Sequence, residues 1–121
     1  MISTTRSESM THEQGDVVVT FFPFADGTLA KERPALIFGG PWKATKDFEV
    51  CWIAMITTTV LKGWPGDIDI ANLSATGLPI PSIVRTLKIA CIDTRAISKK
   101  AGVLDAKTYQ LTLAEIRNHF L

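Results

Sequence analysis

The sequence predicts a mainly β protein, a small antiparallel barrel followed by one C-terminal helix. Short β-branched and aromatic runs alternate with Gly- and Pro-containing turns along most of the chain, which is typical of strands. Only the last segment has clear helical periodicity. With 121 residues, 46% of them hydrophobic, the chain is long enough for one domain with one apolar core.

Five segments are predicted as strands because they are rich in apolar and β-branched residues and are bounded by turn residues. They are residues 17–22, 34–38, 48–58, 67–71 and 82–92. Loops are expected over residues 25–32, 39–47, 61–66 and 72–81. Residues 97–104 are predicted to form a short helical turn or a connector.

The C-terminal helix is predicted from a cap and a stripe. Asp105 is a good N-cap residue. Tyr109, Leu113, Ile116 and Phe120 then follow at helical spacing and define one apolar face.

The formal net charge of +1 excludes a protein that wraps long stretches of nucleic acid, so any such contact must come from a local cluster. Residues 1–14 are polar and rich in Ser and Thr, and we expect a disordered tail there and a single domain over 15–121. The chain has neither a signal-peptide pattern nor an apolar run that could span a membrane, which predicts a cytoplasmic protein. Cys51 and Cys91 are expected to be buried free thiols, with a cross-barrel disulfide as the alternative.

No residue pattern indicates a cofactor or a metal. The chain lacks a Gly-rich phosphate loop and a zinc-ligand spacing. His12 and His119 are expected to be solvated surface residues. Asp67 and Asp69 would share one face of a strand and could hold a divalent ion, but two alternating carboxylates are more typical of the solvated side of a strand.

Three short segments carry the chemistry that the sequence offers. Pro34 restricts Arg33 to an extended conformation where a loop enters a strand, and the planar guanidinium suits a phosphate. Residues 56–59, Ile-Thr-Thr-Thr, end a buried strand. Residues 81–85, Pro-Ser-Ile-Val-Arg, put a second arginine, Arg85, on a strand. Each segment alone also fits a solvated arginine or ordinary β-propensity.

Together with flanking pieces, these segments resemble the MazF/PemK family of toxins from bacterial toxin–antitoxin pairs. The pieces occur in the family's order between Gly15 and the C-terminus. They are Gly-Asp-Val-Val at 15–18, Phe-Pro-Phe at 22–24, Arg-Pro-Ala-Leu-Ile at 33–37, Ile-Thr-Thr at 56–58, Gly-Leu at 77–78, Pro-Ser-Ile-Val-Arg at 81–85 and Gly-Val-Leu at 102–104.

The resemblance implies an SH3-like barrel, a homodimer, a cognate antitoxin, and sequence-selective, metal-independent cleavage of single-stranded RNA. It maps the active site onto Arg33 and Thr57, with Thr58 at the adjacent hydroxyl position. Arg85 matches a further arginine that assists catalysis or RNA binding in some members, and it is the third predicted catalytic residue. The chain departs from some relatives in having Leu87 where they carry an acidic residue. It also lacks the lysine of the Leu-x-Lys-Pro-Ser pattern at 78–82.

These residues support attack of the RNA 2′-hydroxyl on the adjacent phosphorus. Arg33 and Thr57 would donate to the phosphoryl oxygens as charge builds there. The proton acceptor stays open, because a threonine hydroxyl is a poor base and arginine is always protonated. Water, Glu32 and Asp16 are the candidates.

RNA contacts are expected from cations near loops and strand ends, with tryptophans among them. The cations are Lys31, Arg33, Lys43, Lys46, Lys62, Arg85 and Lys88. Lys31, Lys62, Trp64 and Ser82, together with Thr58, are the predicted substrate-binding residues. Trp42 and Trp64 could stack on bases, or could belong to the core or to a dimer interface.

Two other functions remain compatible with the sequence. One is a gyrase-binding poison on the same barrel, like the CcdB-type toxins, and the other is an SH3-like interaction module without activity. The Arg-Pro and Thr-Thr segments favour the ribonuclease, because a protein that only binds does not need them.

Overall fold

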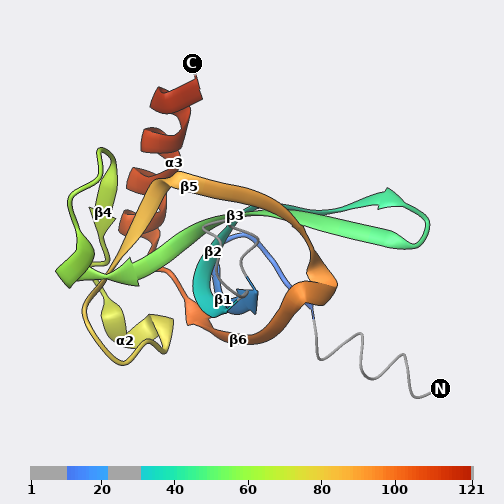
Figure 1. The fold of residues 1–121 in the computed structure, drawn as a ribbon, viewed down its shortest axis with the longest axis horizontal. Coiled ribbons are helices and arrows are strands. Elements are labelled where there is room, and N and C mark those ends of the chain that lie inside the picture. Colours follow the sequence, from blue (N-terminus) through green and yellow to red (C-terminus); the bar gives the residue numbers. More distant parts are fainter. Residues whose placement is uncertain (1–10, 22–30, 121) are drawn as a thin grey trace.

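The computed structural model describes residues 11–21 and 31–120 of the chain. Its six strands are β1 (Asp16–Phe21), β2 (Glu32–Thr45), β3 (Phe48–Thr58), β4 (Asp67–Asp69), β5 (Ser82–Asp93) and β6 (Ile97–Val103). All pair antiparallel in one sheet of order β4-β5-β3-β2-β1-β6. The helices are α2 (Leu73–Thr76) and α3 (Ala106–Phe120), and the 3-10 turns are η1 (Thr59–Leu61) and η2 (Thr94–Ala96). The mainly β prediction with a C-terminal helix is confirmed (Figure 1).

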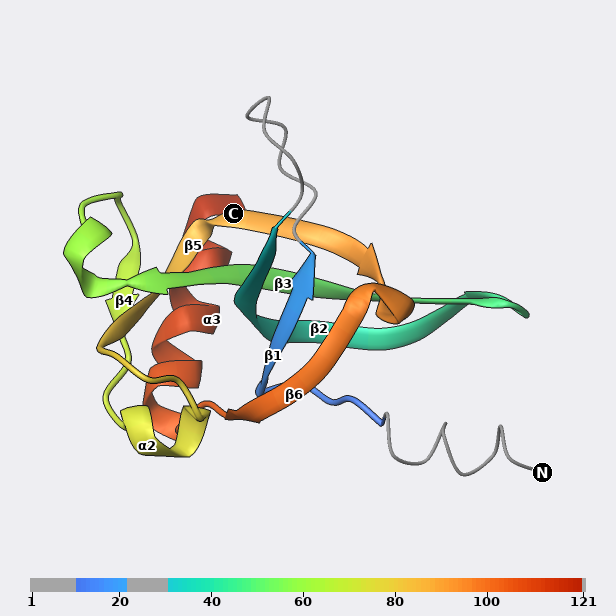
Figure 2. The ribbon, with the colours of Figure 1, turned by 60° about the horizontal axis from the view of Figure 1, so that its bottom comes forward.

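The sheet curls into a barrel-like shape but does not close. β5 and β6 are four positions apart in the sheet order, yet the three-residue η2 turn joins them, so the sheet must bend back on itself (Figure 2). β4 and β6 form the two edges and do not pair with each other in the described part of the chain. The barrel shape therefore comes from curvature rather than from a closed ladder.

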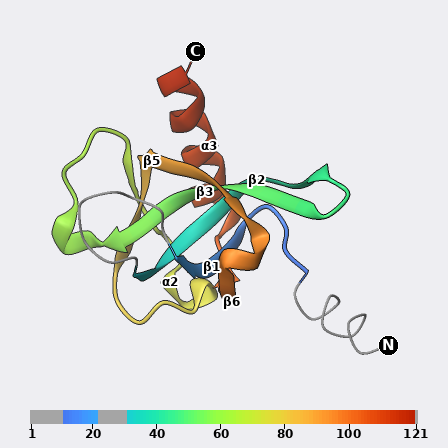
Figure 3. The same ribbon diagram turned by 45° about the vertical axis from the view of Figure 1, so that its right-hand side comes forward.

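Alternation along the strands divides the core between the two faces of the sheet. The face that we call the inner face carries a cluster centred on Val18, Ile37, Ile53 and Met55. The opposite, outer face carries Val17, Leu36, Ala54, Ile56 and Val84, and Leu104 and Tyr109 pack on it. The helix α3 thus covers the outer face, on the side of β4 and β5 (Figure 3).

Two predictions of irregular structure are wrong. Residues 39–47 were expected as a loop, but β2 continues to Thr45. Its ladder with β3 continues past Gly39-Gly40-Pro41 by means of register shifts. The Trp42 ring lies on Gly39 and Gly40, where an added Cβ would be 3.1 and 3.0 Å from ring atoms. Residues 97–104 were expected as a connector, but β6 pairs there with β1.

The remaining strand and helix predictions hold with shifted limits. β3 has the predicted bounds, whereas the strand predicted over 67–71 is limited to Asp67–Asp69. α3 begins after Asp105, but its buried residues are Thr108, Thr112 and Ile116, and Phe120 is exposed. The predicted tail, residues 1–14, and the predicted loop 25–32 lie mostly outside the described residues. No helix in the described ranges is long and apolar enough to cross a membrane.

The cysteines are both free, but only one is buried. Cys91 pairs with Trp52 across the β3–β5 ladder, which puts it on the outer face, while Cys51 points to the inner face. Burial raises the pKa of the Cys51 thiol to about 12, so this thiol is inert. The alternative of a disulfide is excluded by the opposite orientations.

Candidate functional site

The candidate site lies on the inner face, where the central strands end beside η1. The β2–β3 ladder reaches the pair Ala35–Met55, and Arg33 and Thr57 each lie two residues beyond that pair. Since side chains two positions apart share a face, both side chains belong to the inner face of neighbouring strands. Arg85 pairs with Met55 from the other side and therefore belongs to the same face. The structure thus brings the three predicted catalytic residues to one end of one face.

Arg33 is half-buried and takes part in no ion pair among the described residues. It stands opposite Thr20 in the β1–β2 ladder, and Pro34 follows it within the strand. Its backbone is therefore fixed, and no ion pair with another described residue competes with an anion for its guanidinium. Thr57, at the last inner-face position of β3, is 8% exposed.

Thr58 and Ser82 are directed away from this group. They form the last pair of the β3–β5 ladder, one residue from Thr57, so alternation puts them on the outer face. The Thr58 hydroxyl accepts a hydrogen bond from the Val60 backbone at 3.0 Å and caps η1. The Ser82 hydroxyl is buried and donates to the Ile80 carbonyl at 2.8 Å. Both hydroxyls serve the local backbone.

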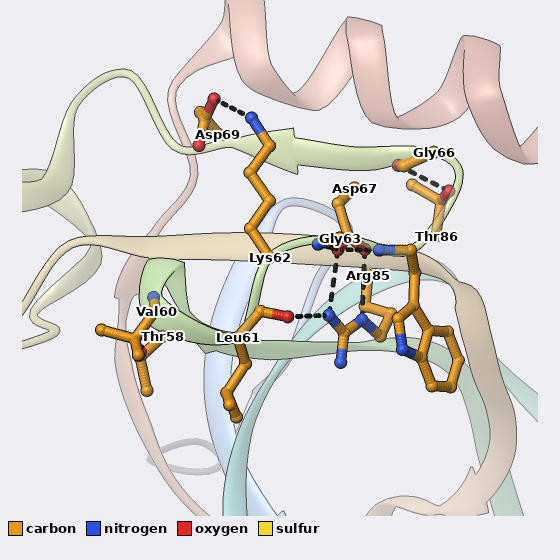
Figure 4. A network of polar contacts seen from close by, with 11 residues as sticks. Thr58, Val60, Leu61, Lys62, Gly63, Gly66, Asp67, Asp69, Arg85 and Thr86 are labelled. Atoms are coloured by element: carbon orange, nitrogen blue, oxygen red, sulfur yellow. Dashed lines mark hydrogen bonds and ion pairs between the residues drawn. The ribbon is translucent and has the colours of Figure 1, made fainter.

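Arg85 is held by a buried carboxylate (Figure 4). Its Nε donates to Asp67 Oδ1 at 3.1 Å, and one terminal nitrogen donates to Asp67 Oδ2 at 2.9 Å and to the Leu61 carbonyl at 2.8 Å. The Arg85 and Asp67 side chains are only 7% and 1% exposed. The bidentate geometry fixes the guanidinium plane.

The same carboxylate organises the turn that carries Trp64. Asp67 Oδ2 accepts from the backbone N–H groups of Gly63 and Trp64, each at 3.0 Å. The Arg85 guanidinium carbon lies 4.4 Å from the centroid of the Trp64 ring, and Lys88 Nζ lies 5.6 Å from it. Trp64 is still 45% exposed, so the turn presents an aromatic surface with cations beside it.

Burial alone would raise the pKa of Asp67. The hydrogen bonds from Arg85, Gly63 and Trp64 and the charge of Arg85 outweigh burial, and they hold the pKa of this carboxyl below its ordinary value. Asp67 is therefore ionised in the folded protein at neutral pH.

The lysines at this end differ in their partners. Lys62 Nζ lies 2.6 Å from Asp69, and both side chains are largely exposed. Lys31 is exposed directly before β2. Because Asp67 binds Arg85 and Asp69 binds Lys62, the two carboxylates considered for a divalent ion are neutralised by side chains of the chain itself.

The two carboxylates considered as proton acceptors are occupied. Glu32 hydrogen-bonds to the Ser98 hydroxyl on β6. Asp16 is buried at the other end of β1 from Thr20 and pairs with Lys100 at 3.2 Å. Asp16 is four residue steps along β1 from Thr20, the position opposite Arg33, which is about 13 Å along the sheet. Neither carboxylate is free beside the Arg33 guanidinium.

The sequence predicted His119 to be a solvated surface residue, but the structure places its ring against a side chain of β5. Its ring Nε2 lies 3.0 Å from the Thr86 hydroxyl, which itself donates to the Gly66 carbonyl at 2.8 Å. The last turn of α3 is thereby connected to the turn between Trp64 and Asp67. No local pattern indicates this contact, since it depends on where the helix lies on the sheet.

The chain is thus a small barrel-like protein, an open, curled antiparallel sheet with a C-terminal helix and a cation-rich end on its inner face. Residues 13–120 match the family described as PemK-like, MazF-like toxin of type II toxin-antitoxin system. The chain therefore belongs to the MazF/PemK toxin family.

Solved structures of this family have the same fold. The Mycobacterium tuberculosis toxin MazF-mt6 is 21% identical with a TM-score of 0.63, and the match covers 87% of this chain and 95% of that one. MazF from Deinococcus radiodurans is 16% identical with a TM-score of 0.70, over 90% and 96% of the two chains. An endoribonuclease in complex with its cognate antitoxin, from a mycobacterial species, is 13% identical with a TM-score of 0.68, over 91% and 95%. No curated protein sequence matches the chain significantly.

Proposed function

We propose that this toxin is a cytoplasmic endoribonuclease that cleaves single-stranded RNA without a metal ion. The observation that carries the proposal is that Arg33 and Thr57, each two residues beyond the Ala35–Met55 pair, lie at the ends of adjacent strands on one face. An arginine without an ion-pair partner in the described residues, on the same face as a buried threonine of the neighbouring strand, is suited to a phosphodiester. Family membership and the endoribonuclease name of one structural relative support the same activity.

In the proposed reaction the RNA 2′-oxygen forms a bond to the adjacent phosphorus and the bond from phosphorus to the 5′-oxygen breaks. The products carry a 2′,3′-cyclic phosphate and a 5′-hydroxyl. The 2′-hydroxyl proton passes to an acceptor and the leaving 5′-oxygen gains a proton. Arg33 and Thr57 donate hydrogen bonds to the phosphoryl oxygens as their charge increases. Since Glu32 and Asp16 are engaged elsewhere, water is the acceptor that we favour.

Cleavage of a mixed-sequence RNA in EDTA tests this proposal. Arg33→Ala and Thr57→Val are expected to lower the cleavage rate on the order of 10²–10³-fold each, because each removes a donor to the developing charge. Thr57→Val keeps the shape of the side chain and removes only the hydroxyl. Arg95 is an exposed arginine in the η2 turn, and Arg95→Ala is the matched control that should cleave like the wild type.

A chimeric substrate separates this chemistry from the alternatives. RNA with a single 2′-deoxynucleotide at the cut site should not be cleaved there, because it lacks the attacking hydroxyl. Persistent cutting at that site would contradict the mechanism. A protein that leaves all RNA intact but causes DNA breakage in cells would instead be a gyrase poison, and one with neither effect would be an inactive module.

The partners that we propose are a cognate antitoxin and a second copy of the chain. Structural relatives include a MazE–MazF complex and a toxin bound to its antitoxin, which supports an antitoxin partner. Exposed apolar side chains on several elements are available for contact with a second copy. They include Trp42, Trp52, Leu111 and Phe120. Sedimentation velocity of the purified chain, with and without the product of a neighbouring short reading frame, tests both partners.

A further inference from the structure

The inner face holds a preorganised unit that the proposed catalytic pair does not use. It consists of Asp67, Arg85 and the Trp64 ring, together with the backbone of residues 61–64. Asp67 accepts four hydrogen bonds, two from Arg85 and two from the turn. A single buried carboxylate therefore fixes both the guanidinium and the turn that carries the indole.

The orientation of Arg85 leaves one donor group over. Nε and one terminal nitrogen are used by Asp67 and Leu61, while no hydrogen bond among the described residues uses the other terminal nitrogen. Among the described residues, that nitrogen is not a buried atom that lacks a partner, so it is exposed to solvent. It can therefore donate to a ligand at the open end of the inner face, next to the indole.

A donor for phosphate oxygens beside an exposed aromatic ring fits one nucleotide of a single strand, with its base on the ring and its phosphate at the guanidinium. Because Asp67 and Arg85 form an ion pair, the pair itself adds no net positive charge for a phosphate. Lys88, with its Nζ near the same ring, supplies a positive charge there.

Building on the proposed ribonuclease function, we propose that Trp64 and Arg85 form a nucleotide-binding subsite of the RNA and that Asp67 is its positioning residue. Arg85 then binds the RNA rather than stabilising the reacting phosphate, and Asp67 acts only through Arg85 and Trp64. This role deepens the sequence prediction for Trp64, and for Arg85 it selects RNA binding over catalysis.

A double-mutant cycle with an abasic nucleotide tests the subsite without needing cleavage. A fluorescein-labelled 2′-O-methyl oligonucleotide resists 2′-hydroxyl attack, so its binding is measured by anisotropy. An abasic nucleotide is moved through each position in turn. At one position, loss of the base should weaken wild-type binding roughly 5- to 150-fold, the range of one stacking contact, and should weaken Trp64→Ala binding much less. Equal losses in both proteins at every position, or no binding of the oligonucleotide, would overturn the subsite.

The role of Asp67 is tested in the same cycle. Asp67→Asn removes the charge and one acceptor, so the coupling between Trp64 and the base should be lost although the indole is still present. Asp93→Asn is the matched control, because Asp93 binds Arg95 through the same two types of guanidinium nitrogen near the η2 turn. The control should keep the full coupling. If Asp67→Asn does not fold, Arg85→Lys carries the test, since lysine keeps the charge but cannot make both bonds to Asp67.

Cleavage kinetics separate this proposal from the proposed function. If the wild type cuts RNA and Asp67→Asn raises KM with little change in kcat, both hold. A large fall in kcat at unchanged KM would make Arg85 catalytic and overturn the subsite alone. If the wild type binds with the predicted coupling but cuts no RNA, only the proposed function fails.

Discussion

At the scale of single residues, two glycines explain how the loop before β5 is attached to the sheet edge. Gly77 ends α2 with a φ of +74°, and a Cβ there would lie 2.1 Å from the Ala101 carbonyl oxygen. A Cβ on Gly102 would lie 2.3 Å from the Ala75 carbonyl oxygen. Both glycines are in segments that carry the family resemblance, and the structure gives the physical reason, a close backbone approach between α2 and β6.

We expect Gly77→Ala to destabilise the protein by more than about 1 kcal/mol, because it combines a strained left-handed conformation with a backbone clash. Gly15→Ala is the matched control, since Gly15 also has a positive φ of +94° but nothing lies within 4 Å of its added Cβ. Urea unfolding followed by far-UV circular dichroism measures both. A loss for Gly77→Ala no larger than that for Gly15→Ala would show that the close approach does not matter.

The catalytic candidates at this scale come from the family resemblance, which maps the active site onto Arg33 and Thr57. Arg33 before a proline and Thr57 at a strand end are visible in the sequence, and the β2–β3 register brings them to one face. The partnership of Asp67 with Arg85 could not be predicted. It depends on β4 pairing with β5, and strand order in a sheet is a tertiary property that local patterns do not encode.

At the scale of elements, β3 could be predicted from its local pattern, whereas β6 could not. β3 is a central strand with a long apolar run, so its bounds follow from its pattern. β6 has the sequence Ile-Ser-Lys-Lys-Ala-Gly-Val, is an edge strand, and pairs with β1 through two register shifts. A polar edge strand has little of the apolar alternation on which strand prediction relies.

Asp105, predicted as the N-cap of the C-terminal helix, also links the start of α3 to the segment before α2. Asp105 accepts hydrogen bonds from the Thr108 backbone at 2.8 Å and from the Asn72 backbone at 3.1 Å. Asp105→Ala should therefore lower the free energy of unfolding by about 1–2 kcal/mol, the usual range for loss of an N-cap. Asp105→Ser should retain most of this stability, and chemical denaturation of the three proteins compares them. Equal destabilisation by Ala and Ser would mean that the cap hydrogen bond contributes little.

At the scale of the whole molecule, carboxylates that link separate segments determine how the fold responds to acid. Asp67 connects β4, β5 and the Trp64 turn, and Asp105 connects α3 to the segment before α2. For both, burial alone would raise the pKa. The hydrogen bonds that they accept outweigh burial and lower the pKa, for Asp105 mainly through Thr108 and Asn72.

A carboxyl with a lower pKa in the folded protein than in the unfolded chain binds fewer protons when folded, so it stabilises the fold above its unfolded pKa. That contribution is lost as the pH falls through the ordinary value of 3.8 and toward the lower folded pKa. We therefore expect the free energy of unfolding to decrease steeply below about pH 4.

Asp67→Asn and Asp105→Asn should each be less stable at neutral pH, and their free energy of unfolding should depend less steeply on pH below it. Asp47→Asn, on the exposed β2–β3 hairpin, should keep the wild-type profile in urea titrations between pH 7 and pH 3. If the free energy of unfolding of both Asp67→Asn and Asp105→Asn falls with pH as steeply as that of the wild type, other groups cause the acid sensitivity. The two carboxylates would then not be the links that hold the segments together.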